Sequence, residues 1–180
     1  MILMQVVFVT GNKNKYEEAK RILSGFDVIQ EKFDIDEIQG EADEIINDKL
    51  AKAYAHLMRP CIVEDVSLEM EGLNGLPGPY IKHFFEKLGT EGLYDLVKDK
   101  DKKARAKAYI GYTDGKSTEI FVGSVEGRIC KPSPVRRFAF DPIFIPEGYE
   151  KPFSELENKN EISHRRKALD KLREYLEGKK

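Results

Sequence analysis

Polar residues that suit phosphate binding lie at the first break in the sequence pattern. The β-branched and aromatic run Val6–Val9 is typical of a strand buried on both faces, and a helical pattern follows the turn at Gly11 and Asn12. Backbone N–H groups and the helix dipole bind phosphate at such turns. Gly11 would let the backbone approach an anion closely, and Lys13 and Lys15 would neutralise it. The segment lacks P-loop spacing, and the simpler alternative is an ordinary turn with Asn12 as helix cap and solvated lysines.

Two adjacent carboxylates, Glu64 and Asp65, follow the short apolar run Cys61–Val63, which predicts a second buried strand. Ligands of α/β proteins bind outside the carboxyl ends of strands, and alternation along the chain should turn one carboxylate of the pair toward a given cleft. Carboxylate oxygens suit Mg²⁺, and Glu37 is a further carboxylate that a loop could bring there. The alternative is that both members of the pair face water.

A third group of candidates opens the last helical pattern, where His164 and Arg165 follow Ser163. Positive side chains at a helix N-terminus oppose the dipole, so this placement favours the binding of an anion or of an electron-rich group of a ligand. The alternative is that both side chains point outward. For Lys49 and Lys82, which lie on helical patterns, the simpler interpretation is a solvated face.

The elements that must position these residues alternate between strands and helices. Helical spacing is found after Tyr16 and in four later segments, and apolar or alternating runs predict the strands. The predicted helices are 16–26, 41–57, 80–88, 92–97 and 163–176, and the predicted extended segments are 6–9, 61–63, 104–113, 118–125 and 138–145. Asp114-Gly115 predicts a hairpin turn. We therefore expect an α/β fold with a mixed sheet.

The composition limits the class of protein. The 180 residues are 41% hydrophobic and 34% charged, which fits one domain, 1–180, with a real core and excludes a disordered chain. The formal net charge of −2 argues against a nucleic-acid partner. Two cysteines give neither a disulfide framework nor a zinc site, and we expect a cytoplasmic protein that does not cross a membrane.

Six short blocks in order resemble the inosine triphosphate pyrophosphatase (Ham1-like) family. They span nearly the whole chain, and their order is more specific than any single block. The blocks are Phe8-Val9-Thr10-Gly11-Asn12 with Lys15, Gln39-Gly40-Glu41, Val63-Glu64-Asp65, Gly75-Leu76-Pro77-Gly78-Pro79-Tyr80-Ile81-Lys82, Phe138-Ala139-Phe140-Asp141-Pro142, and Lys159-Asn160-Glu161-Ile162-Ser163-His164-Arg165.

The resemblance implies an ITPase/Maf-like fold, in which an elongated mixed sheet flanked by helices forms two lobes around a substrate cleft, and a homodimer. It implies Mg²⁺-dependent hydrolysis of ITP, dITP and XTP to the monophosphate and pyrophosphate. Glu37 and Asp65 match metal-linked carboxylates, and Asp65 matches the general base. The residues matched to substrate binding are Thr10, Gly11, Asn12, Lys13, Asn14, Lys15, Lys49, Asp65, Val66, Lys82, Phe138, Ala139, Phe140, Asp141, Lys159, His164 and Arg165.

Base selectivity is expected at the last two blocks. Donors from His164 and Arg165 aimed at the 6-oxygen of hypoxanthine or xanthine would meet the amino group of adenine unfavourably. Phe138 could stack on the purine or pack in the core. Ala139 stands where the family commonly has glycine, which matters if the backbone there has a positive φ or approaches the base.

Two other functions fit part of the pattern. One is a related pyrophosphatase that removes another modified nucleotide from the pool. The other is a nucleotide-binding module without catalysis, which the carboxylates at Glu37, Glu64 and Asp65 argue against. An anion-binding module gains nothing from acidic side chains unless a metal bridges them.

Overall fold

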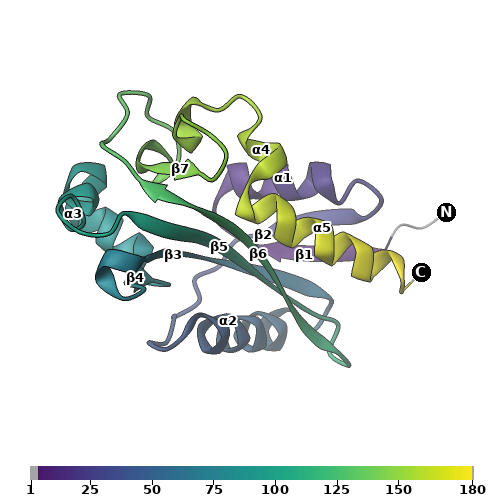
Figure 1. The fold of residues 1–180 in the computed structure, drawn as a ribbon. Helices are drawn as coiled ribbons and strands as arrows, with labels where there is room; N and C mark the ends of the chain where they lie inside the picture. Colours follow the sequence, from purple (N-terminus) through teal and green to yellow (C-terminus); the bar gives the residue numbers. More distant parts are fainter. Residues whose placement is uncertain (1–3, 180) are drawn as a thin grey trace. The chain divides into compact units, whose positions relative to one another are not determined.

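A computed structural model describes residues 4–179 of the chain (Figure 1). The strands are β1 (Gln5–Val9), β2 (Asp27–Glu31), β3 (Cys61–Met70), β4 (Pro77–Gly78), β5 (Lys103–Thr113), β6 (Thr118–Ile129) and β7 (Phe144–Pro146). The α-helices are α1 (Lys13–Ile22), α2 (Ala42–Leu57), α3 (Ile81–Asp95), α4 (Lys159–Ile162) and α5 (His164–Glu177). Short 3₁₀ helices lie at Glu71–Leu73, Asp141–Ile143 and Phe153–Glu155.

The sheet is mixed, as the alternation of elements predicts. Its strand order is β2-β1-β3-β5-β6-β7, and β4 pairs with β3 beside this path. β1 is parallel to both β2 and β3, whereas β4 is antiparallel to β3 and β7 is antiparallel to β6. The mixed α/β fold class is thereby confirmed.

The chain forms two compact units, each with its own apolar core. The first unit comprises Met1–Asp65, Ala108–Gly123 and Arg165–Lys180, and the second comprises Val66–Lys107 and Ser124–His164. β3, β5 and β6 each contribute residues to both units. The candidate residues are divided between the two units.

The first unit packs helices on both faces of its strands. Side chains that alternate along β1 divide between the two faces, because successive residues of a strand point to opposite sides. Val6 and Phe8 pack with residues of α1 and α5, whereas Val7 and Val9 pack with residues of α2. This double coverage explains why the N-terminal run is continuously apolar.

The second unit packs its helices and loops around one cluster. Leu68 and Met70 of β3 contact Ile81 and Leu93 of α3 and a group of phenylalanines from the segment after β6. α3 is interrupted at Gly89, whose φ of 64° and ψ of −172° break the helix between the two predicted helical segments.

Several predicted elements are confirmed, whereas β3 is predicted too short and the extended segment 138–145 is wrong. α2 begins after Glu41 with a capping box, and β5 and β6 flank the predicted turn at 114–117. β3 is ten residues long rather than three. Residues 138–145 are mostly turn and 3₁₀ helix rather than an extended segment. The predicted closing helix 163–176 is confirmed by α5, which begins directly after Ser163. β2 is missed in the sequence pattern because only one of its five residues is fully buried.

Candidate active site

The turn between β1 and α1 is held by its own side chains. Thr10 Oγ1 accepts the N–H of Asn12 at 3.1 Å, and Asn12 Oδ1 accepts the N–H of Lys15 at 3.1 Å, which makes Asn12 the helix N-cap. The predicted cap is confirmed. The first turn of α1 carries no acidic residue that would neutralise the positive end of the helix dipole. The turn is therefore suited to receive an anion.

Strand register places the carboxylate pair beside this turn. Val7 pairs with Cys61 and Phe8 with Ile62, so β3 continues past the end of β1 from Glu64 onward. The prediction that the pair follows the end of its own strand is wrong, because Glu64 and Asp65 lie in the middle of β3. They nevertheless lie beyond the carboxyl end of the parallel neighbour β1, which is where α/β proteins bind ligands.

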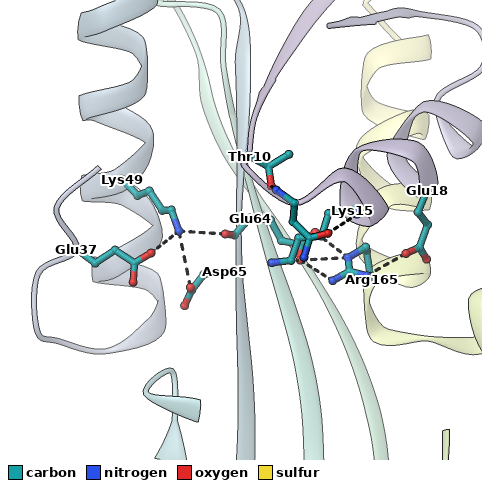
Figure 2. Close-up of polar contacts among 9 residues, drawn as sticks. Thr10, Lys15, Glu18, Glu37, Lys49, Glu64, Asp65 and Arg165 are labelled. Atoms are coloured by element: carbon teal, nitrogen blue, oxygen red, sulfur yellow. Dashed lines mark hydrogen bonds and ion pairs between the residues drawn. The ribbon is translucent and has the colours of Figure 1, made fainter. Parts of the chain in front are cut away.

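Glu64 is buried and surrounded by cations. Arg165 donates from Nε to Oε2 at 2.9 Å and from Nη2 to Oε1 at 3.0 Å, and Lys15 Nζ lies 3.0 Å from Oε1. Burial alone would raise the pKa of Glu64, but Arg165 and Lys15 outweigh it and hold that pKa at about 2. Glu64 is therefore a charged acceptor whose oxygens already pair with both cations (Figure 2).

Arg165 is buried as well, and a second carboxylate shares it. Its Nη1 donates to Glu18 Oε2 at 2.9 Å, so three of its N–H groups serve two acidic side chains. This geometry favours a role for Arg165 in holding Glu64 and Glu18, and its role in recognising the base stays a prediction. Sequence reasoning missed Glu18, although a carboxylate beside Ala19 on the apolar face of α1 was a signal for a buried partner.

Asp65 lies on the other side of β3 with a different environment (Figure 2). Its Oδ2 is buried and has no hydrogen-bond partner among residues 4–179, and its Oδ1 lies 4.0 Å from Lys49 Nζ. Burial raises the pKa of Asp65 to about 6. Lys49 lowers this pKa, but the negative charges of Glu37 and Glu64 oppose that effect. The expected alternation of the carboxylate pair is thus confirmed.

Lys49 of α2 connects the two predicted metal-linked carboxylates. Its Nζ donates to Glu37 Oε1 at 2.6 Å and to the backbone oxygen of Glu64 at 3.3 Å. The loop before α2 thereby brings Glu37 to the same ammonium group that faces Asp65. Lys49 is partly buried at this place, so the interpretation as a solvated helix face is wrong.

The residues around Asp65 fit a hard divalent cation. Asp65 offers a buried oxygen that makes no hydrogen bond within the described chain, and Glu37 offers a second carboxylate that shares its ammonium partner. Within residues 4–179 there is no group of three or more His, Cys, Asp and Glu side chains placed to hold a metal. One or two carboxylates with the remaining ligands from phosphate and water are what Mg²⁺ usually takes.

In the second unit, the predicted base-recognition residues form a separate cluster. His164 stacks on Phe140, with ring centroids 5.9 Å apart, and lies 6.1 Å from the ring of Phe153. Asp141 is buried and pairs with Lys159. The cluster thus combines aromatic faces with a charged pair.

Phe138 and Ala139, which precede Phe140 in the chain, differ from it in exposure and in backbone conformation. Phe138 is 38% exposed, whereas Phe140 packs in the core, so core packing accounts for Phe140 alone. Ala139 has a φ of 43°, which is in the left-handed region, so the residue stands in a conformation that glycine would adopt more easily.

The remaining candidates are divided between the two units. Gly11, Lys13 and Asn14 are exposed in the first unit. In the second unit, Lys82 is exposed in the first turn of α3, and Val66 is partly buried against the core. Thr10 to Lys15, Lys49, Asp65 and Arg165 are thus positioned within one unit.

These features define an α/β protein that can receive an anion beside a carboxylate pair. A model of the Ham1 family matches residues 6–175, and the chain belongs to that family. No helix among residues 4–179 is long and apolar enough to cross a membrane.

Two curated relatives are both called inosine triphosphate pyrophosphatase. The one from Scheffersomyces stipitis is 40% identical over 188 residues, covering 95% of this chain and 97% of the relative. The one from Schizosaccharomyces pombe is 38% identical over 185 residues, covering 99% and 98%.

Solved structures agree with the fold. The Ham1 protein of Staphylococcus aureus superposes with a TM-score of 0.83 at 30% identity, covering 98% of this chain and 100% of that one. A HAM1 protein from Coxiella burnetii gives a TM-score of 0.85 at 24% identity with the same coverage, which supports the fold alone.

Proposed function

We propose that the protein hydrolyses non-standard purine nucleoside triphosphates, namely ITP, dITP and XTP, to the monophosphate and pyrophosphate. Relatives named inosine triphosphate pyrophosphatase at 38–40% identity over nearly the whole chain support this activity. The observation that carries the proposal is Asp65, a buried carboxylate with a raised pKa that faces the Lys49 ammonium group it shares with Glu37.

Phosphate binding falls to the β1–α1 turn and its lysines. A triphosphate carries several negative charges that must be neutralised before its anhydride can be cleaved. The N-terminus of α1 supplies N–H groups and a positive dipole, and Lys15 and Lys49 supply ammonium groups. Lys13, which is exposed in the same turn, would contact the outer phosphates, and for Lys82 of the second unit phosphate binding stays a prediction.

Glu37 and Asp65 would hold Mg²⁺ through their carboxylate oxygens. When bound, Mg²⁺ would neutralise phosphate charge and make a bound water more acidic. Asp65 would orient the attacking water and accept its proton, which a carboxyl with a pKa near neutrality does well. The oxygen of that water forms the new bond to phosphorus, the anhydride between the α and β phosphates breaks, and pyrophosphate leaves.

Base selection is proposed for the aromatic cluster of the second unit. Phe138 is exposed enough to stack on a purine, and His164 and Lys159 bring hydrogen-bond donors to the segment that follows it. Arg165 can contribute to base selection only through an N–H that Glu64 and Glu18 do not take. A donor facing the 6-oxygen would favour ITP over ATP.

We further propose that residues 1–180 act as one catalytic domain in a cytoplasmic homodimer. Three strands that contribute to both units support the single domain. The resemblance to the family is the support for the homodimer. Sedimentation equilibrium of the purified chain tests the dimer directly.

The activity is tested by product analysis with Mg²⁺ and a panel of ITP, dITP, XTP, GTP and ATP. Equal amounts of monophosphate and pyrophosphate from the first three nucleotides, with little turnover of GTP and ATP, are expected. Release of orthophosphate and a diphosphate would contradict cleavage between the α and β phosphates. Turnover confined to another modified nucleotide would favour the related pyrophosphatase instead.

A further inference from the structure

Lys49 contacts both carboxylates that the proposed function assigns to the metal. Its Nζ is 2.6 Å from Glu37 Oε1 and 4.0 Å from Asp65 Oδ1, and it also donates to the backbone oxygen of Glu64 at 3.3 Å. Figure 2 shows the ammonium group between the two acidic side chains. One positive charge therefore lies where two carboxylates converge.

The position of Lys49 is built into the fold rather than left to a flexible surface. The neighbouring residues Ile46, Leu50 and Ala53 of α2 pack in the same core as Val63 of β3, which fixes the helix against the strand. The ammonium group, at the end of four methylene groups, can still change partner at little cost. Packing thus fixes the backbone at Lys49 and Asp65, whereas the ammonium group can exchange partners.

We propose that Lys49 competes with the divalent metal for Glu37 and Asp65. The inference rests on the proposed function, because that function assigns the metal to these carboxylates. A lysine ammonium and a divalent cation both take their stabilisation from the same oxygens, and each must displace the other. Lys49 therefore weakens metal binding until another anion attracts its ammonium group.

A nucleotide triphosphate would be such an anion. Phosphates that extend from the β1–α1 turn toward Asp65 would offer Lys49 new partners and would leave Glu37 and Asp65 to the metal. By linkage, anything that draws Lys49 away strengthens metal binding, and metal binding strengthens the attraction of Lys49 to phosphate by the same factor. Metal and nucleotide are then expected to bind together rather than one at a time.

The test measures binding of Mn²⁺ alone, without nucleotide, by electron paramagnetic resonance. Lys49→Gln removes the competing charge, and we expect its Mn²⁺ affinity to rise about tenfold over wild type, which is the effect of one ordinary ion-pair interaction in a half-buried site. Adding Asp65→Asn to Lys49→Gln should abolish the gain, because the gain belongs to this pair of carboxylates.

Lys52→Gln is the matched control. Lys52 lies on the same helix and carries the same charge, but it contacts Asp48 and the backbone oxygen of Asp36. Its loss should change Mn²⁺ affinity by less than about twofold. An equal gain in Lys52→Gln and Lys49→Gln would show a general effect of net charge and would overturn the proposal.

Other outcomes are equally decisive. An unchanged or weaker Mn²⁺ affinity in Lys49→Gln, or no binding by any variant, overturns the competition. Failure of the proposed function gives a different result, since wild type would then release no pyrophosphate from ITP whatever its Mn²⁺ affinity. The two proposals can therefore fail separately.

Discussion

Glu64 and Asp65 are neighbours on β3 and have opposite environments. Glu64 is surrounded by Arg165 and Lys15 on one side of the strand, and its pKa is held at about 2. Asp65 shares one lysine with Glu37 on the other side, keeps a buried oxygen without a hydrogen bond in the described structure, and has a pKa raised to about 6.

The difference shows that partners and burial, rather than residue type, decide what a carboxylate does. An acid whose lone pairs and charge are satisfied stabilises the fold and has little capacity left for a substrate. An acid that is buried and under-satisfied destabilises the fold and is available for a metal or a proton. The difference therefore favours a structural role for Glu64 and supports the catalytic role proposed for Asp65.

The largest expected effect is the loss of turnover in Asp65→Asn. The amide cannot accept the proton of the attacking water and is a poorer metal ligand, so pyrophosphate release from ITP should fall about a thousandfold. The rate is measured by coupled pyrophosphate detection, with circular dichroism to show that the variant is folded. Retention of more than about a tenth of the activity would remove Asp65 from the mechanism.

Glu64→Gln should instead lower the free energy of unfolding by about 3 kcal/mol, because the buried Arg165 then keeps Glu18 but loses the charge of its other carboxylate partner. Urea denaturation measures the change. Glu17 is exposed on α1, the helix that also carries Glu18. The control Glu17→Gln should therefore change the free energy of unfolding very little. A neutral result for Glu64→Gln would break the distinction between the two acids.

The two acids should also give opposite pH dependence of stability. The pKa of Glu64 is lowered from 4.5 to about 2, so its stabilisation is complete above pH 4.5 and is lost as the pH falls toward 2. The pKa of Asp65 is raised from 3.8 to about 6, so its contribution is present below pH 3.8 and is lost as the pH rises through 6.

Urea midpoints of wild type and each variant across this range test these signs. The stability lost in Glu64→Gln should shrink as the pH falls below 4.5. Asp65→Asn should gain stability relative to wild type as the pH rises from 3.8 to 6, by about 3 kcal/mol in total, because each pKa unit is worth about 1.4 kcal/mol. Parallel curves for the two variants would contradict the account.

The smallest expected effect concerns the turn that carries Lys15. Asn12→Ala removes the N-cap bond to the N–H of Lys15 and should lower the free energy of unfolding by about 1 kcal/mol. The KM for ITP should rise while kcat stays within about twofold, since the proposed function gives the turn a role in phosphate binding and none in the proton transfer. A fall in kcat with KM unchanged would place the turn in the chemical step instead.

The sequence predicted the elements whose local signals are strong. α2 carries an apolar stripe and an acidic first turn, and the hairpin at Asp114-Gly115 has a clear turn signal. The β1–α1 turn with its Asn12 cap was likewise readable, because the signals for strand end and helix start lie next to each other. These features depend on residues close together in the chain.

The features that escaped prediction depend on distant partners. The sequence suggests an exposed Glu64, because no residue near it in the chain indicates that Arg165 of the last helix pairs with it. The length of β3 was missed because polar and charged residues interrupt its apolar pattern after Val63. The segment 138–145 reads as extended, but Ala139 at a positive φ and Pro142 turn the chain instead.

One measurement tests the contrast between the two acids directly. Carbon-13 NMR of side-chain carboxyl groups, assigned by comparison with Asp65→Asn and Glu64→Gln, gives both pKa values in the wild-type protein. The account predicts a value near 6 for Asp65 and one near 2 for Glu64. Two values near the ordinary range of about 4 would show that the neighbours do not differ and would contradict the division of roles.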